Sequence, residues 1–316
     1  MSYAIKTRGR VGRDIRALAQ QELTRSIESF QALDTTTVAT LPHEIRKRLK
    51  RLRALVSLIR EPLGKKAYRV EDDALRQAGC ALAAVRDAQA LLKTLQQLQR
   101  RFFSGKAPSV LRPLREALLQ HEQERIAALV DSATLQQSIA DLQAAQARAA
   151  DWPIEDYGWK DLRQALKRSY RRSRESFVDA RERLSAAHLH RWRKRVKDLW
   201  AHLRLIQRVC PALMEELAQD FKVLGEFLGD DHDLVVLRGD LEKRCDNPGH
   251  IPALATFLDL VDLRRDELLD AAFDLGARLH ADTPGAFARE LDALRSTHRR
   301  RSRKAKALTT QVSAAH

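Results

Sequence analysis

The sequence has few residues that break helices and few aromatic residues. Of its 316 residues, 12 are glycine and 9 are proline, and aromatic side chains make up 5%. The remainder is dense in Ala, Leu, Arg, Gln and Glu, which form helices readily. This composition argues against a sheet-rich fold and predicts an all-α protein.

Paired cysteines and long apolar segments are also missing. Cys80, Cys210 and Cys245 are odd in number, far apart in the chain and without a CxxC pair. We therefore expect neither a disulfide framework nor a zinc site, and a reducing cytosol is the expected compartment. No run approaches the roughly 18 apolar residues of a spanning helix. Met1–Arg16 lacks the apolar core of a secretory signal, so a cytoplasmic protein outside the membrane is expected.

Positive charge is what the sequence has in excess. The net charge is +15, and four stretches (43–53, 160–174, 191–204 and 295–306) together carry +23, which leaves −8 for the rest of the chain. A single charge run is most often a solvated helix face, but four runs on an otherwise acidic chain form a pattern. The pattern indicates a polyanionic partner, whether nucleic acid, anionic lipid or a phosphate polymer.

Two of these basic stretches read as copies of one segment. The sequence HEIRKRLK at His43–Lys50 superposes on HRWRKRVK at His190–Lys197. A looser second correspondence joins Val85–Leu91 to Asp231–Leu237. The chain is therefore predicted to be a tandem repeat, with its joint in the Pro- and Gly-containing segment Asp151–Gly158.

Within each copy, basic and apolar residues fall on opposite faces of a helix. At about 100° per residue, the cations three, four and seven positions after the histidine lie within about 60° of it. Like charges at this spacing cost a few tenths of a kcal/mol per pair, a cost that a bound anion would offset. The apolar face comprises Ile45, Leu49, Leu52, Val56 and Ile59 in the first copy and Trp192, Val196, Leu199, Leu203 and Ile206 in the second.

Apolar periodicity predicts helices along nearly the whole chain, and short connections favour antiparallel packing. We expect two antiparallel bundles of about four main helices each, residues 1–150 and 151–306, related by pseudo-two-fold symmetry. Residues 307–316 are expected to be a disordered tail. The expected helices span 12–33, 41–60, 71–101, 109–149, 159–184, 186–209, 214–228, 233–244, 251–280 and 285–306, with loops at 34–40, 61–66 and 105–108.

These segments resemble the CHAD domain family, helical domains named for their histidines. The likeness rests on HEIRKRLKRLR at His43–Arg53 and HRWRKRVKDL at His190–Leu199, and it extends over nearly the whole chain. AVRDAQALL at Ala84–Leu92, LGDDHDLVVL at Leu228–Leu237 and Tyr170–Arg174 support it. The resemblance implies a duplicated helical fold that binds inorganic polyphosphate in a basic groove or pore. The sequence shows no ExExK motif of the CYTH domain that accompanies CHAD in many relatives, so a stand-alone binding module, associated with polyphosphate granules, is expected.

Carried onto this sequence, the resemblance places the polyphosphate contacts on the two histidine faces. Where the first copy has Arg51 and Arg53, the second has Asp198 and Trp200, so the second basic face is expected to be shorter, with Arg204 as a candidate extension. The candidate contacts are His43, Arg46, Lys47, Lys50, Arg51, Arg53, His190, Arg193, Lys194, Lys197 and Arg204. A secondary basic surface is expected at Lys160, Arg163, Lys167, Arg171 and Arg174.

Other interpretations stay open for these residues. His43 and His190 are also compatible with plain surface positions or with metal ligation. A helical nucleic-acid binder would share the positive charge, although a binder of single strands normally places aromatic residues among its cations. A metal-dependent phosphohydrolase would use His232 and Asp233. We instead interpret Asp230–Asp233 as a capped helix N-terminus, and we expect no metal site, no cofactor and no enzymatic activity.

Overall fold

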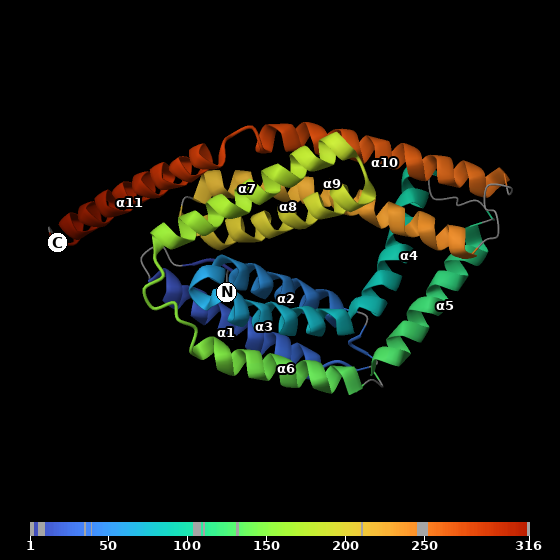
Figure 1. Ribbon diagram of the computed structural model, residues 1–316, viewed down its shortest axis with the longest axis horizontal. Coiled ribbons are helices and arrows are strands. Elements are labelled where there is room, and N and C mark those ends of the chain that lie inside the picture. Colours follow the sequence, from blue (N-terminus) through green and yellow to red (C-terminus); the bar gives the residue numbers. More distant parts are fainter. Residues whose placement is uncertain are drawn as a thin grey trace. The chain divides into compact units, whose positions relative to one another are not determined.

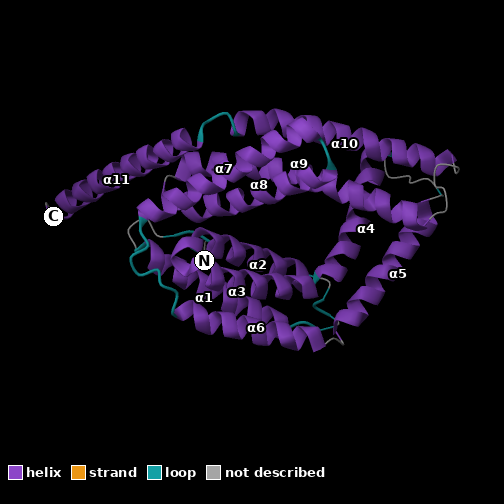
Figure 2. Ribbon diagram, in the orientation of Figure 1, coloured by secondary structure: helices purple, strands orange, loops and turns teal. Residues whose placement is uncertain are grey.

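Helices account for nearly all of the part of the chain that the computed structural model describes, and no strand occurs in that part (Figure 2). The described residues are 3–5, 10–34, 36–38, 40–103, 109, 111–130, 133–209, 211–244 and 252–314. The all-α fold that the composition predicts is therefore confirmed. The helices are α1 (Val11–Gln31), α2 (Leu41–Leu58), α3 (Arg60–Ala81), α4 (Ala83–Phe102), α5 (Leu111–Val130), α6 (Ala133–Ala150), α7 (Trp159–Arg183), α8 (Ala186–Ile206), the 3₁₀-helix η1 (Gln207–Val209), α9 (Pro211–Arg244), α10 (Pro252–Leu279) and α11 (Pro284–Ala314).

The chain divides into two compact units, and each is described by itself. Unit 1 comprises Met1–Leu18, Ile154–Val223 and Gly276–His316, and unit 2 comprises Ala19–Pro153 and Leu224–Leu275. Each unit thus contains residues from both sides of the joint predicted near residue 151. The division into halves 1–150 and 151–306, the pseudo-two-fold symmetry and the tail at 307–316 stay predictions.

Unit 2 is a bundle in which α2 packs on α3 and α3 packs on α6 (Figure 1). Buried carboxylates join these helices: Glu71, which is 3% exposed, accepts two hydrogen bonds of 2.9 and 3.0 Å from the Arg148 guanidinium. A second core forms where α4 and α5 meet α10 and the end of α9. It contains leucines of all four helices together with Phe257 and Val261, because each helix turns its apolar stripe toward the others.

Unit 1 is built on the hairpin of α7 and α8, with α11 packed on α7. Its core holds an aromatic cluster: the ring of His280 stacks on Phe177 at 5.3 Å and meets Phe221 edge-on at 5.6 Å, and Trp192 lies 5.2 Å from Phe177. Gly276 faces this cluster. A Cβ atom there would lie 2.6 Å from the Trp192 ring, so only glycine fits without movement of the core.

The first half departs from the predicted helix boundaries at three places. The predicted loop at 61–66 lies within α3, because its residues are mostly helix formers and only Gly64 leaves the helical conformation, with φ 75° and ψ 163°. The predicted helix 71–101 is interrupted at Leu82, three residues after Gly79 in the last turn of α3. The predicted helix 109–149 is two helices, α5 and α6.

In the second half, the break predicted between residues 228 and 233 does not occur. The helix α9 continues from Pro211 to Arg244 through Asp230–Asp233, so the interpretation of this acidic cluster as a helix N-terminus is wrong. The glycines beside it do not end the helix, since glycine inside a helix costs only about 1 kcal/mol relative to alanine. The loop predicted at 105–108, together with Cys210 and Cys245, lies outside the described residues.

Candidate functional site

The first histidine face lies on α2 in unit 2. The five residues predicted to form its apolar side, Ile45 to Ile59, are at most 2% exposed. His43, Lys47 and Lys50 are exposed on the other side, with Arg46 and Arg53 half-buried at its edge. The division of this helix into a buried stripe and a cationic stripe is therefore as the spacing predicts.

Two of the predicted contacts on α2 already hold carboxylates of neighbouring helices. Arg53 forms a bidentate pair with Asp72 of α3, at 2.8 Å from Nε to Oδ1 and 3.1 Å from Nη2 to Oδ2. Arg51 lies 3.7 Å from Glu22 of α1, whose side chain is almost fully buried. These arginines connect helices of unit 2, so the exposed lysines and His43 are the most accessible members of the face.

The guanidinium of Arg86, which is not among the contacts predicted from the sequence, acts on Arg46. Burial lowers the pKa of Arg46, and the positive charge of Arg86 in the first turn of α4 lowers it further. Arg86 lies 3.0 Å from Asp87 and 3.9 Å from Asp233 of α9. The sequence feature that could have pointed to Arg86 is the AVRD segment at Ala84–Asp87. This segment corresponds loosely to the one around Asp233, and the two segments meet in unit 2.

The second histidine face lies on α8 in unit 1. The five apolar residues from Trp192 to Ile206 are fully buried. His190 and Lys194 are exposed, whereas Arg193 and Lys197 are half-buried. Burial lowers the pKa of His190, and the charges of the neighbouring Arg193, Lys194 and Lys197 lower it further.

Beyond Lys197, the second face differs from the first, as the substitutions at Asp198 and Trp200 predict. Asp198 lies 3.5 Å from Arg195 of the same helix. The Arg204 guanidinium lies 5.5 Å from the centre of the half-buried Trp200 ring. The aromatic residues Trp192 and Tyr170 are buried in the core of unit 1.

The secondary basic surface on α7 is largely engaged in packing. Arg163 forms an ion pair with Asp292 of α11, and Arg174 donates a 3.1 Å hydrogen bond from Nε to the His280 carbonyl. Arg171 lies 3.7 Å from Glu175 on its own helix. Lys160 is exposed and Lys167 half-buried. Arg163 and Arg174 therefore help to fix α7 against its neighbours, whereas Arg171 pairs only within its own helix.

The acidic cluster in α9 serves ion pairs of unit 2. Asp231 is buried and accepts a 2.9 Å hydrogen bond from Arg265 of α10. Burial raises the pKa of Asp230, and the charge of Asp233 raises it further. Within the described residues, no three His, Cys, Asp or Glu side chains are placed to hold a metal ion.

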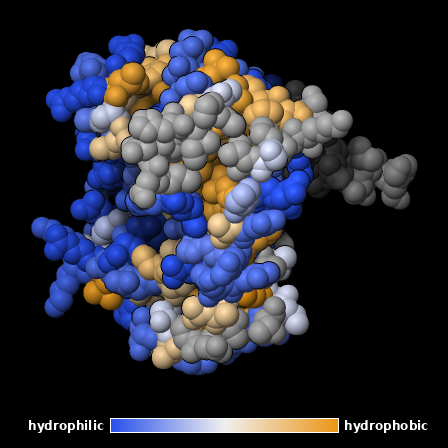
Figure 3. Space-filling model, turned by 90° about the vertical axis from the view of Figure 1, so that its right-hand side faces the viewer, coloured by the Kyte–Doolittle hydropathy of each residue, from blue (hydrophilic) through white to orange (hydrophobic). Residues whose placement is uncertain are grey.

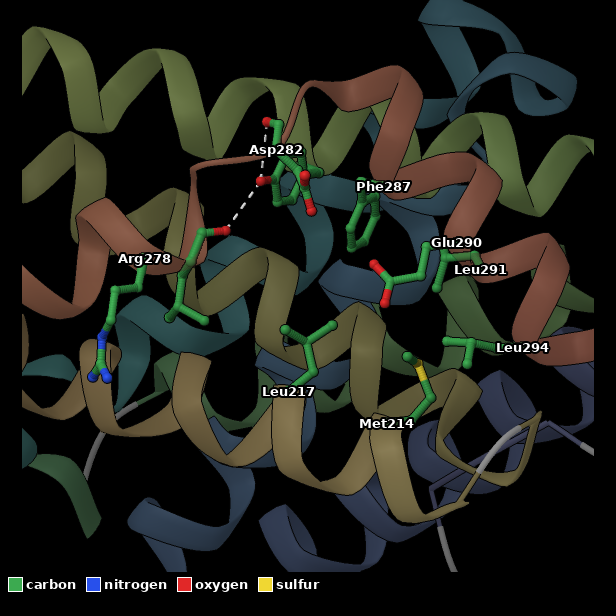
Figure 4. Close-up of a pocket in the computed structure, with 10 residues that line it drawn as sticks. Met214, Leu217, Arg278, Asp282, Phe287, Glu290, Leu291 and Leu294 are labelled. Atoms are coloured by element: carbon green, nitrogen blue, oxygen red, sulfur yellow. Dashed lines mark hydrogen bonds between the residues drawn. The ribbon is translucent and has the colours of Figure 1, made fainter.

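A small pocket of about 140 Å³ lies in unit 1, between residues of α7, α9, α10 and α11 (Figure 4). Met214, Leu217 and Phe287 give it apolar walls, and Asp282 and Glu290 line it as well. None of the candidate cations lines it. Arg278 also lines the pocket, but two carboxylates against one cation make it a poor receptor for a polyanion.

Most of the surface seen in Figure 3 is hydrophilic, with hydrophobic residues in smaller groups. No helix among the described residues is long and apolar enough to cross a membrane. The fold and the two faces define an all-helical protein with two histidine-centred cationic helices, one in each unit.

A comparison with known protein families identifies the family to which this helical protein belongs. The sequence model of the CHAD domain matches residues 21–242, which is more than half of the chain, so the protein belongs to the CHAD domain family. This family is associated with polyphosphate binding. The matched range includes both histidine faces and the acidic cluster of α9. The comparison with curated proteins finds no match.

Proposed function

We propose that this protein binds inorganic polyphosphate through the basic faces of α2 and α8. The observation that carries the proposal is the repeated design of these helices. In each, a histidine and its neighbouring cations occupy the side opposite a stripe that is at most 2% exposed. The cationic side is therefore held outward by the packing of the apolar side, although its like charges repel one another.

The chemistry of the faces suits a phosphate polymer. Lysine, arginine and protonated histidine donate charge-assisted hydrogen bonds to phosphate oxygens, and such bonds are about twice as strong as neutral ones. From the histidine to the last lysine, each stripe is about 10 Å long at 1.5 Å per residue. The buried positions of Trp192 and Tyr170 leave few platforms on which bases could stack.

We further infer that the two faces line one groove, so that a single polymer contacts both. The exposed or half-buried members of the faces carry most of the binding: His43, Lys47, Lys50, His190, Arg193, Lys194 and Lys197. Arg51 and Arg53 contribute less, because Glu22 and Asp72 already neutralise part of their charge. In the cell, the protein acts in the cytoplasm on polyphosphate granules, as a binding module without catalytic activity.

The test is a charge reversal on both faces. The variant Lys50→Glu with Lys197→Glu is expected to lose polyphosphate binding while its helical circular dichroism persists, because both changes lie on solvent-facing sides of their helices. A matched control is Lys65→Glu with Lys222→Glu, which makes the same charge change at one exposed lysine of each unit. Equal affinities of the two double variants would contradict the proposal.

Competition and turnover assays separate the alternatives. Labelled polyphosphate is challenged with unlabelled polyphosphate, DNA, RNA and heparin at near-physiological salt. We expect polyphosphate to displace the label at far lower concentration than the nucleic acids, and an equal effect of DNA or RNA would favour a nucleic-acid binder. Incubation of polyphosphate with the protein and Mg²⁺ or Mn²⁺ is expected to release no phosphate, since Asp231 and Asp233 lie against arginines.

A further inference from the structure

Two guanidinium groups converge at the turn between α3 and α4 in unit 2. Arg46 of α2 donates a 2.5 Å hydrogen bond from Nη1 to the carbonyl of Gly79, near the end of α3. Arg86 lies one turn into α4, which itself contacts α2. The basic face of α2 therefore has a neighbouring cation on a second helix.

The like charges of Arg46 and Arg86 are only partly compensated. The charge of Arg86 lowers the pKa of Arg46, and the smaller, opposite effect of Asp87 does not cancel it. The counter-ions of Arg86 are Asp87, at 3.0 Å with its side chain 58% exposed, and Asp233, at 3.9 Å. An exposed pair and a pair as long as 3.9 Å each contribute little, so a phosphate group with more charge and more acceptor oxygens can compete with both.

We propose that Arg86 is a further polyphosphate-binding residue, which extends the basic face of α2 onto α4 while Asp87 and Asp233 hold its guanidinium near Arg46. This inference rests on the proposed function and adds a contact to the same site. A phosphate that bridges the two guanidinium groups removes their mutual repulsion and receives charge-assisted hydrogen bonds from both. Arg86 therefore contributes more to binding than an arginine whose charge acts only through solvent.

The experiment measures polyphosphate affinity as a function of salt for Arg86→Gln and for the matched control Arg76→Gln. Arg76 lies on α3 of the same unit, is exposed and pairs with Asp73 at 3.1 Å. Both variants therefore lose one arginine that pairs with the neighbouring aspartate, Arg86 being the more buried of the two. For Arg86→Gln we expect affinity to fall by about five- to tenfold and the slope of log affinity against log salt to shrink by about one. The control is expected to stay within about twofold of the wild type.

The wild type and Lys50→Glu are measured in the same series, which separates the inference from the proposed function. If the wild type binds and Lys50→Glu weakens binding, but Arg86→Gln matches Arg76→Gln, the role of Arg86 is refuted and the proposed function stands. If the wild type does not bind polyphosphate, both are refuted.

Thermal unfolding monitors whether the loss of Arg86 disturbs the fold. Should Arg86→Gln fail to fold, Arg86→Lys gives the answer, because it keeps the charge and loses the planar guanidinium. For Arg86→Lys we expect weaker binding of polyphosphate and an unchanged slope of log affinity against log salt. Wild-type affinity in that variant would overturn the inference.

Discussion

At the scale of single residues, the core of unit 1 depends on a histidine that stays neutral. The Nδ1 of His280 donates to the Gly276 carbonyl at 2.9 Å, so its Nε2 accepts the hydrogen bond of 2.9 Å from Ser173 Oγ. Burial lowers the pKa of His280 to about 4, and the nearby charge of Arg174 acts in the same direction. The hydrogen bond to the Gly276 carbonyl opposes this shift only in part. A positive charge in this aromatic cluster would be unfavourable.

The first prediction concerns stability in acid. The folded pKa of His280 lies below its unfolded value, so the unfolded chain binds more protons between about pH 6.5 and pH 4. Through this group alone, the free energy of unfolding should fall by roughly 3 kcal/mol as the pH is lowered across that window. Denaturant titrations at several pH values measure this. His280→Phe should flatten the dependence, whereas His121→Asn, on α5 outside the cluster, should leave it intact.

The second prediction compares two helical glycines. Gly276→Ala places a Cβ atom 2.6 Å from the Trp192 ring and 3.0 Å from Phe177, and such overpacking costs about 1–3 kcal/mol. Gly239→Ala, within α9, meets nothing within 4 Å and should stabilise by about 0.5–1 kcal/mol through helix propensity. Thermal unfolding of the two variants should therefore shift in opposite directions. A stabilised Gly276→Ala would show that the aromatic cluster yields easily.

At the scale of the element, α8 shows how one helix combines packing with an electrostatic function. Helical spacing gathers Arg193, Lys194 and Lys197 around His190, and the fully buried stripe fixes the rotation of the helix so that this side stays out of the core. The cations disfavour the protonated imidazole, so the face loses part of its charge near neutral pH. A polyanion bound to the same face would reverse that effect.

The third prediction follows from this coupling between protons and ligand. Because the pKa of His190 is lowered in the free protein and a bound polyanion raises it, binding takes up a proton. Polyphosphate affinity should therefore increase as the pH falls from 8 to 6. His190→Gln should reduce this dependence, which calorimetry in buffers of different ionisation enthalpy detects as a smaller proton uptake. Equal wild-type affinities at both pH values would exclude a direct role for the imidazole.

At the scale of the whole molecule, the two histidine faces belong to different units, α2 to unit 2 and α8 to unit 1. The fourth prediction tests whether they act on one polymer. Long polyphosphate should bind with one chain per protein and lose affinity on Lys50→Glu or Lys197→Glu alone, because linked sites gain from effective concentration. A short oligophosphate, which reaches one face only, should be bound more weakly and respond less to each single change. Independent binding of two long chains would contradict a shared groove.

The local properties of the chain were predictable because they depend on neighbours in sequence. Residue spacing determines which side of α2 or α8 is apolar, and the buried stripes from Ile45 to Ile59 and from Trp192 to Ile206 follow it. The all-α class follows from helix propensities for the same reason. The pseudo-two-fold symmetry and the shared groove are of another kind, because they depend on packing between distant helices, and they stay predictions made from sequence likeness.

Only tertiary structure decided the partners of individual charges. Arg51 and Arg53 were predicted to belong to the same basic face as Lys47 and Lys50. Both nevertheless form ion pairs with carboxylates of other helices, Glu22 and Asp72. Arg86 joins the surroundings of Arg46, and Asp233 reaches Arg86 from a helix far away in the chain. Helical periodicity fixes the direction of a side chain about its own axis, whereas the charge that it meets depends on packing between helices distant in sequence.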